Sequence, residues 1–323
     1  MGPSPQAIEA AREAVVGAQL YPDGGAFHLR RTLAEYHGIE PADLLFGAGS
    51  NEIIHMLVQA FCRPGIDQVL AHEKAFISYG LAARGHGVEL VTTPTTDEQA
   101  CDIDAFIAAM NPRTKVIFLA NPNNPTGSYV PRAEFERILD AVPEQALLVV
   151  DEAYHEYSVA AADDYPRSQT YRRPNLLTLR SFSKIHGLAG LRVGYAIGDP
   201  RVLALLNRIR RPFNLNVVAQ AAAAAALADE GHVEATRRIT REGLEAITRT
   251  IEKIGLRTYP FLGNFVLVRV PGSGRDAYLA LLQKGVIVRA MEPWGVPQHV
   301  RISAPRLEDL ERVTTTIEEV LGS

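Results

Sequence analysis

Residues 181–195 read Ser181-Phe182-Ser183-Lys184-Ile185-His186-Gly187-Leu188-Ala189-Gly190-Leu191-Arg192-Val193-Gly194-Tyr195. They lie between two hydrophobic runs, residues 175–179 and 193–197, and this arrangement predicts a loop between two strands. The stretch 181–195 contains one lysine, two serines, one arginine and three glycines. Such a composition indicates a binding site rather than a plain connection.

Lys184 is the reactive group of this loop or a solvated surface charge, which is the commoner fate of a lysine. Its neighbours favour the first interpretation. Ser181, Ser183 and Arg192 are the donors that a phosphate dianion requires, and the glycines let the backbone approach a ligand closely. An amine beside a phosphate site predicts pyridoxal 5'-phosphate as cofactor, because its aldehyde bonds covalently to lysine and its phosphate anchors it.

The composition narrows the class of protein. A chain of 323 residues is long enough to divide into two domains. Its net charge is −4, from 33 basic and 37 acidic residues, so we expect small-molecule substrates and neither nucleic acid nor a membrane as partner. The two cysteines, Cys62 and Cys101, are too few for a disulfide framework or a zinc site. We expect buried thiols and no metal.

No targeting or membrane signal is evident. The first residues lack the basic and apolar regions of a signal peptide. The most apolar segment, residues 217–228, is shorter than the ~20 residues that a membrane-spanning helix needs. The sequence therefore predicts a cytoplasmic protein.

Several hydrophobic runs end in polar or glycine-rich residues. They alternate with predicted helices, which indicates an α/β fold with a mostly parallel sheet covered on both faces. In open α/β sheets, ligands bind just beyond the carboxyl ends of the strands. Five predicted strands end in this way, near Gly47, Ala71, Ala120, Val150 and Leu179. We expect these five ends to meet at one site.

The turn at residues 47–52, Gly-Ala-Gly-Ser-Asn-Glu, enters a predicted helix. The free N–H groups and the positive dipole end of a helix N-terminus favour an anion, which we expect to be phosphate. A dinucleotide-binding motif is the alternative. Glu52 stands where that motif has its third glycine, and no ribose-binding acid follows at the usual spacing.

Three motifs occur in the order Asn-Pro-Thr-Gly at 124–127, Asp-Glu-Ala-Tyr at 151–154 and Ser-Phe-Ser-Lys at 181–184, followed by Gly-Leu-Ala-Gly-Leu-Arg-Val-Gly-Tyr. They resemble fold type I aminotransferases that depend on pyridoxal phosphate, in particular the histidinol-phosphate aminotransferase family, which also contains aromatic amino acid aminotransferases. The resemblance covers nearly the whole chain.

The resemblance implies a large cofactor-binding domain with a mostly parallel sheet and a smaller α+β C-terminal domain. We place the large domain at residues 21–212 and the small one at 213–323, with an N-terminal helix, residues 1–20, packing on the small domain. The predicted short strands 265–268, 286–288 and 299–302 belong to the small domain.

The resemblance also assigns roles to single residues. Lys184 holds the cofactor and moves the substrate's proton. Asp151 pairs with the protonated pyridine nitrogen; a carboxylate at the end of a hydrophobic strand would otherwise be costly to bury. Asn124 and Tyr154 contact the cofactor's O3′. Phe76 stacks on the ring, where the family often has tyrosine, although a plain core aromatic is the simpler interpretation.

The remaining roles concern phosphate and substrate. The implied phosphate contacts are Ser50, Asn51, Ser181, Ser183, Arg192 and Tyr21, the last reaching across the interface of a homodimer. The implied substrate contacts are Arg301, nearby Arg289 and, more weakly, Asn264. Without the resemblance, Tyr21 would be part of a Pro/Gly turn and the arginines ordinary ion-pair partners. Glu152 and His155 could equally be solvated.

The expected activity is transfer of an amino group between histidinol phosphate, or an aromatic amino acid, and a 2-oxo acid such as 2-oxoglutarate. The alternatives are an enzyme like threonine-phosphate decarboxylase and a non-catalytic pyridoxal-phosphate-binding protein. Relatives carry an N-terminal arm ahead of a Gly-Pro-Ser-Pro segment, which here is residues 2–5. We expect such an arm to improve turnover more than cofactor binding; equal activity with and without it would contradict this.

Overall fold

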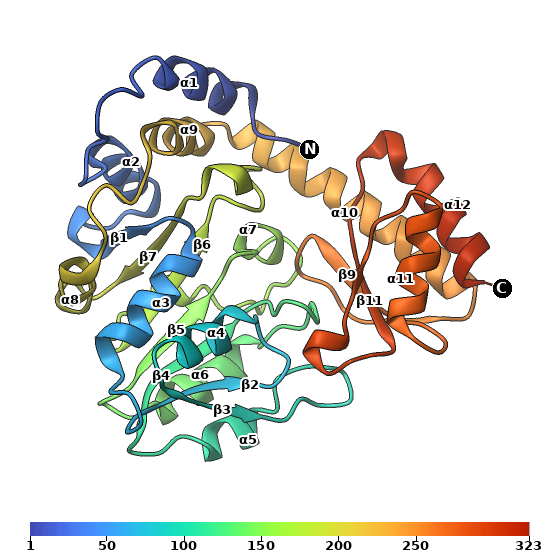
Figure 1. Ribbon diagram of the computed structural model, residues 1–323, viewed down its shortest axis with the longest axis horizontal. Coiled ribbons are helices and arrows are strands. Elements are labelled where there is room, and N and C mark those ends of the chain that lie inside the picture. Colours follow the sequence, from blue (N-terminus) through green and yellow to red (C-terminus); the bar gives the residue numbers. More distant parts are fainter. Residues whose placement is uncertain (323) are drawn as a thin grey trace.

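The computed structural model describes residues 1–322, which build a seven-stranded and a four-stranded sheet with helices packed on both (Figure 1). The strands are β1 Leu44–Gly47, β2 Gln68–His72, β3 Glu89–Thr93, β4 Thr114–Ala120, β5 Leu147–Asp151, β6 Leu176–Ser181, β7 Gly194–Gly198, β8 Arg257–Thr258, β9 Phe265–Arg269, β10 Arg289–Ala290 and β11 His299–Ser303. The helices are α1 Pro5–Val15, α2 Phe27–His37, α3 Ser50–Phe61, α4 Ser78–Gly85, α5 Ile103–Ala108, α6 Arg132–Ala141, α7 His155–Ser158, α8 Pro200–Ile209, α9 Val217–Ala228, α10 Glu230–Lys253, α11 Gly274–Gln283 and α12 Leu310–Leu321.

The larger sheet has the strand order β1-β7-β6-β5-β4-β2-β3. Strands β3, β2, β4, β5 and β6 pair in parallel, whereas β7 is antiparallel to both β6 and β1. Because two reversals cancel, β1 runs in the same direction as β6. The predicted mostly parallel sheet is therefore confirmed, and the five predicted strand ends lie along one edge.

Alternation along β4 explains why helices cover both faces of this sheet. Val116 and Phe118 belong to the core shared with α3 and α4, whereas Ile117 and Leu119 pack against α5 and α6. All four side chains are fully buried. Burying one such side chain contributes about 1.5–3 kcal/mol, so each face is strongly specified.

A third core lies beside β1 and β7, where α2 and α9 pack. Helix α1 lies alongside α9 (Figure 1) and contacts it extensively. Ile8 and Val15, the large apolar residues at helical spacing in this segment, are both exposed, and Ala7 is buried instead. Small side chains let the two helices approach closely, so the alanine face packs inward although it is less hydrophobic.

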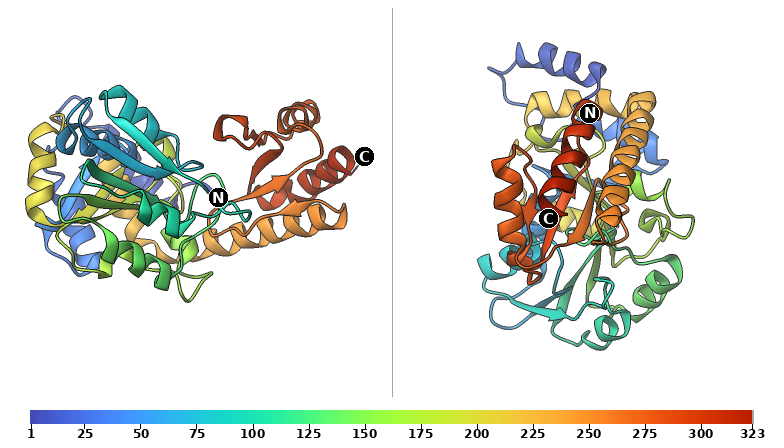
Figure 2. Two further views of the ribbon diagram at one scale, coloured as in Figure 1. Left: turned by 90° about the horizontal axis from the view of Figure 1, so that it is seen from below. Right: turned by 90° about the vertical axis from the view of Figure 1, so that its right-hand side faces the viewer.

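Helix α10, 24 residues long, runs from the large sheet to the antiparallel sheet β10-β11-β9-β8 (Figure 2). Its C-terminal half packs with α11 and α12 on that sheet. The strand predicted at 286–288 is wrong, since pairing begins only at Arg289, opposite Arg301. Val286 and Val288 are nevertheless buried, which explains the misleading pattern. The domain limits at residues 20 and 212 stay a prediction.

Both cysteines are free and buried, as predicted. Within residues 1–322, no helix has the length and apolar character that crossing a bilayer requires.

Candidate active site

The carboxyl ends of the large sheet's strands surround a cavity of about 260 Å³. The residues that line it include every cofactor contact expected from the sequence except Tyr21: Ser50, Asn51, Phe76, Asn124, Asp151, Tyr154, Ser181, Ser183, Lys184 and Arg192. They come from five separate segments of the chain. The parallel topology therefore brings together side chains that are far apart in the sequence, from Ser50 to Arg192.

Lys184 stands on the loop that leaves β6. The loop is closed by backbone hydrogen bonds from Phe182 N to Val193 O at 3.1 Å and from Gly187 N to Lys184 O at 3.0 Å. The Lys184 ammonium nitrogen lies 5.1 Å from the centre of the Tyr154 ring, a cation–π distance. The amine is thus held over an aromatic wall of the cavity.

Asp151 ends β5 and is buried against α4. Its Oδ2 accepts a hydrogen bond from the Tyr79 hydroxyl at 3.0 Å, and its Oδ1 accepts one from Ala153 N at 3.2 Å. Desolvation raises the pKa of Asp151 to about 6, although the Tyr79 hydrogen bond opposes this rise. Both donors are neutral, so within residues 1–322 the buried carboxylate has no cationic hydrogen-bond partner. A ring with a protonated nitrogen fits this position.

The N-terminus of α3 and Arg192 form an anion site. Gly49, at φ 77°, precedes α3, and no side chain caps the helix there. A Cβ on Gly49 would collide with the Arg192 guanidinium, and one on Gly194 would collide with the Ser50 amide nitrogen. The two glycines therefore bring helix start, guanidinium and β7 into close contact. Free N–H groups, a positive dipole and an arginine together suit a phosphate.

Hydroxyls and an amide complete this anion site. The Ser181 hydroxyl accepts a hydrogen bond from Ser183 N at 3.1 Å, which fixes the start of the Lys184 loop. The buried Asn51 Oδ1 has no hydrogen-bond partner among the described residues. An unpartnered buried polar atom beside a cavity is expected where a ligand binds.

The other walls of the cavity are aromatic. Phe76 meets Tyr79 edge to face, with ring centres 5.9 Å apart. Tyr154 is buried and packs edge to face on Phe265 of β9 at 5.4 Å. A flat ring inserted between these walls would be shielded from water.

The expected substrate arginines lie outside the residues that line this cavity, but Arg301 reaches it through a contact. Its Nη1 donates to the Asn124 side-chain oxygen, and its guanidinium lies 4.8 Å from the Phe265 ring centre. Desolvation lowers the pKa of Arg301, and its buried Nε has no partner among residues 1–322. The Arg301 Nε–H group is therefore available to donate a hydrogen bond to an anion.

Two further candidates are less directly placed. Arg289 pairs with Arg301 across the β10–β11 ladder, and its guanidinium lies 5.6 Å from the Trp294 ring centre. Asn264 uses its backbone carbonyl to accept a hydrogen bond from Ala304.

Tyr21 is separate from the cavity of its own chain. Its side chain is 84% exposed and stacks on Phe213, with ring centres 4.9 Å apart. Within one subunit, therefore, Tyr21 belongs to an exposed apolar surface.

The sequence missed a buried ion pair next to Asp151. Glu152, expected to be as easily solvated as buried, is fully buried and lies 2.7 Å from Arg180 Nη2. Ser168 N also donates to it at 2.9 Å, and His155 Nδ1 lies 3.2 Å away. Burial acts to raise the pKa of Glu152, but the Arg180 charge together with the contacts to His155 and Ser168 outweighs it, and the pKa falls to about 2. The burial of Glu152 was not predictable from the local sequence, because its cationic partner Arg180 is 28 residues away.

The sequence also missed Tyr79, because a tyrosine inside a helix gives no local sign that its hydroxyl reaches a carboxylate. Its hydroxyl position follows only from the packing of α4 on the sheet.

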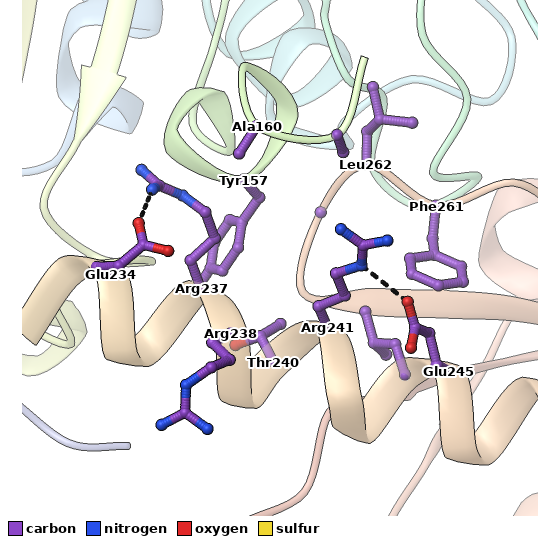
Figure 3. Close-up of a pocket in the computed structure, with 13 residues that line it drawn as sticks. Tyr157, Ala160, Glu234, Arg237, Arg238, Thr240, Arg241, Glu245, Phe261 and Leu262 are labelled. Atoms are coloured by element: carbon purple, nitrogen blue, oxygen red, sulfur yellow. Dashed lines mark hydrogen bonds and ion pairs between the residues drawn. The ribbon is translucent and has the colours of Figure 1, made fainter.

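A second cavity, of about 450 Å³, lies between α10 and the segment around α7 (Figure 3). Its charged side chains satisfy one another: Arg237 pairs with Glu234, and Arg241 Nε donates to Glu245 at 2.8 Å. The charges on the surface of this cavity therefore nearly cancel. Among the described residues that line it, there is no reactive amine like Lys184 and no buried carboxylate like Asp151.

The chain is similar to known aminotransferases over nearly its whole length. Residues 1–317 match the family described as aminotransferase class I and II. The chain is 42% identical to a histidinol-phosphate aminotransferase of Anaeromyxobacter sp., over 100% of this chain and 89% of that protein, and 40% identical to one of Moorella thermoacetica, over 100% and 83%. The crystal structure of a histidinol-phosphate aminotransferase from Sinorhizobium meliloti in complex with pyridoxal-5'-phosphate is 28% identical, with a TM-score of 0.90 over 99% of this chain and 88% of that one. The chain belongs to the class I and II aminotransferase family.

Proposed function

We propose that this protein is a pyridoxal-phosphate-dependent aminotransferase that acts on histidinol phosphate and a 2-oxo acid. The observation that carries the proposal is one cavity that holds Lys184, a buried Asp151 without a cationic hydrogen-bond partner, and the anion site of α3 and Arg192. Lys184 suits an aldehyde, Asp151 suits a protonated pyridine nitrogen, and the anion site suits a phosphate, and pyridoxal phosphate carries all three groups.

The cofactor would be held from three sides. Ser50, Asn51, Ser181, Ser183 and Arg192 would bind its phosphate, and Asp151 would bind its ring nitrogen. Asn124 and Tyr154 would contact its ring hydroxyl, and Phe76 would cover one face. When bound, pyridoxal phosphate supplies an electron sink for the substrate's Cα electrons.

The chain's own groups would perform the proton transfers. Lys184 carries the amine that we assign to removing the proton from the substrate's Cα and returning it during transamination. Asp151 would keep the ring nitrogen protonated, because a buried carboxylate is stabilised by an adjacent cation. The aromatic walls and the buried Tyr154 would exclude water from the transfer.

The substrate assignment rests on the relatives' names and on Arg301. The two relatives at 42% and 40% identity are both histidinol-phosphate aminotransferases. Arg301 offers an unpartnered Nε, and Arg289 lies across the ladder from it, so two guanidiniums would bind an anionic substrate group. Asn264 is a weaker candidate at the same wall. An aromatic amino acid would present a carboxylate to the same arginines.

We also propose a homodimer in which Tyr21 contributes to the neighbouring subunit's phosphate site. Its 84% exposed side chain, far from its own cavity, supports this. A cytoplasmic location stays a prediction.

The test is the visible absorption spectrum of the purified protein mixed with pyridoxal phosphate, followed by single additions of histidinol phosphate, phenylalanine, glutamate and threonine phosphate. We expect a cofactor band that histidinol phosphate bleaches at the lowest concentration, and that a 2-oxo acid restores. A Lys184→Ala variant should show no such cycle. Release of carbon dioxide from threonine phosphate would favour a decarboxylase, and the absence of any band would contradict the proposal.

A further inference from the structure

Tyr79 connects two walls of the candidate active site. It stands in the first turn of α4 and is almost completely buried. Its ring stacks on Phe118 of β4, with centres 4.5 Å apart and planes 3° from parallel, and it meets Phe76 edge to face. Its hydroxyl donates to Asp151 Oδ2 at 3.0 Å. One side chain thus contacts the residue expected to cover the cofactor ring and the residue expected to bind its nitrogen.

The hydroxyl determines how the carboxylate is oriented. Ala153 N holds Oδ1 and Tyr79 holds Oδ2, so the plane of the Asp151 carboxylate is fixed by two donors. If the hydroxyl were removed, Oδ2 would lose its donor in a buried environment, where an unsatisfied polar atom is destabilising.

The hydroxyl also affects ionisation. Burial, and then the charge of Asp151, raise the pKa of Tyr79 well above its usual value, so the phenol stays protonated and remains a donor. Its hydrogen bond favours the ionised form of Asp151 and opposes desolvation, which raises the pKa of that carboxyl to about 6. The other ionisable groups that act on Asp151 or Tyr79 are Lys184, Glu152 and Tyr154. Of these, only Lys184 favours the carboxylate through its charge.

We propose that Tyr79 is a positioning residue for the reaction: through one hydroxyl and one ring it keeps Asp151 ionised and oriented and keeps Phe76 in place. The consequence for the cofactor rests on the proposed function. The link between Tyr79 and Asp151 does not, because it is a property of the ligand-free protein.

The variant Tyr79→Phe separates this role from packing, because it keeps the ring on Phe118 and removes only the hydroxyl. The matched control is Tyr195→Phe. Tyr195 is also buried, and its hydroxyl bonds to His37 Nε2 at 2.9 Å, away from the residues that line the cavity. Both variants lose one buried phenolic hydrogen bond.

The first measurement is the pKa of Asp151 in the cofactor-free protein, determined from the pH dependence of its carboxyl-carbon NMR signal. We expect Tyr79→Phe to raise this pKa by about one unit, the equivalent of one hydrogen bond, and Tyr195→Phe to leave it unchanged. An unchanged value in Tyr79→Phe would overturn the proposal, whatever the effect on thermal stability.

The second measurement is the affinity for pyridoxal phosphate as a function of pH, read from the visible band. Tyr79→Phe should bind about threefold more weakly near pH 6.5, because a one-unit rise in the Asp151 pKa lowers the ionised fraction about threefold at that pH, and it should approach the wild type near pH 8.5, where Asp151 is ionised in both proteins. An equal loss at every pH, shared by Tyr195→Phe, would mean that Tyr79 only packs. If the wild type bound no cofactor, the proposed function would fail, while the NMR titration would still decide the Tyr79–Asp151 link.

Discussion

At position 151 a carboxylate is buried at the end of a strand with two neutral donors. Its pKa is about 6 in the folded protein, against a usual value of 3.8. A raised acid pKa means that the folded state holds the proton more tightly than the unfolded state. Stability is therefore lost as the pH rises from about 4 to about 6, and this loss stays complete above pH 6.

We predict that Asp151→Asn makes the cofactor-free protein more stable at pH 8 but not at pH 4. Asparagine keeps an acceptor for Tyr79 and removes the desolvated charge. The shift from 3.8 to about 6 corresponds to an upper limit of about 3 kcal/mol. Thermal unfolding at the two pH values measures the difference. With pyridoxal phosphate present, the same variant should lose affinity; a variant less stable than the wild type at pH 8 would contradict the burial argument.

At the scale of elements, the start of α3 is fixed by its contact with β7. Gly194 faces the Ser50 amide so closely that a Cβ would collide with the helix backbone, whereas Gly190, in the preceding turn, has open space around it. Backbone cannot move aside as a flexible side chain can, so the two glycines should respond differently to the same substitution.

We predict that Gly194→Ala weakens pyridoxal phosphate binding at least tenfold but changes the binding of pyridoxal, which lacks the phosphate, much less. The reason is that the helix start would shift away from Arg192 and the anion site would open. Gly190→Ala is the control and should bind both compounds as the wild type does. Equal losses for the two compounds would show that the variant disturbs more than the phosphate site.

The ends of β5 and β6 are joined by the buried Glu152–Arg180 pair. The alternation of the two strands places this pair on the sheet face opposite Asp151 and Ser181, which line the cavity. The pair therefore holds together the two strand ends that carry cofactor-binding candidates without touching the cavity itself.

We predict that Glu152→Ala lowers the free energy of unfolding by about 3–5 kcal/mol, because it removes the nearer carboxylate from the buried Arg180 and leaves only Glu156, 3.8 Å from Arg180 Nη1. Replacing both residues by methionine should cost less than the single change. The exposed pair Arg238–Glu242 provides the control, since Arg238→Ala should change stability by no more than ~1 kcal/mol. Urea unfolding monitors all three. A single variant that is no less stable than the double variant would argue against a poorly compensated buried charge.

At the scale of the whole molecule, an apolar surface surrounds the turn between α1 and α2. Val16, Leu20 and Tyr21 are 80%, 69% and 84% exposed, and Phe213 stacks against Tyr21. Contiguous exposed apolar side chains mark an interaction site. The proposed partner is a second copy of the chain, to whose phosphate site Tyr21 would contribute.

We predict a dimer in sedimentation experiments and complementation between two variants. Tyr21→Ala lacks the donated residue and Lys184→Ala lacks the amine, so each dimer should be weakly active or inactive alone. After mixing and exchange of subunits, about a quarter of the wild-type activity should appear, because half of the dimers are mixed and each has one complete site. A mixture no more active than the two variants measured separately would contradict a shared site.

The sequence alone determined the fold class, the parallel strand ends and, through motifs that resemble a known family, most of the residues that line the cavity. Hydrophobic runs and the motifs directly after them are local features, so a strand and the residue at its end are read together, as with β5 and Asp151. Only the tertiary structure decided the partners of these residues. Tyr79 meets Asp151 across 72 residues, Arg180 meets Glu152 across 28, and Arg301 meets Asn124 across 177. Such pairs depend on which face of a helix or strand turns inward, and that choice is made by packing energy summed over the whole core rather than by local sequence.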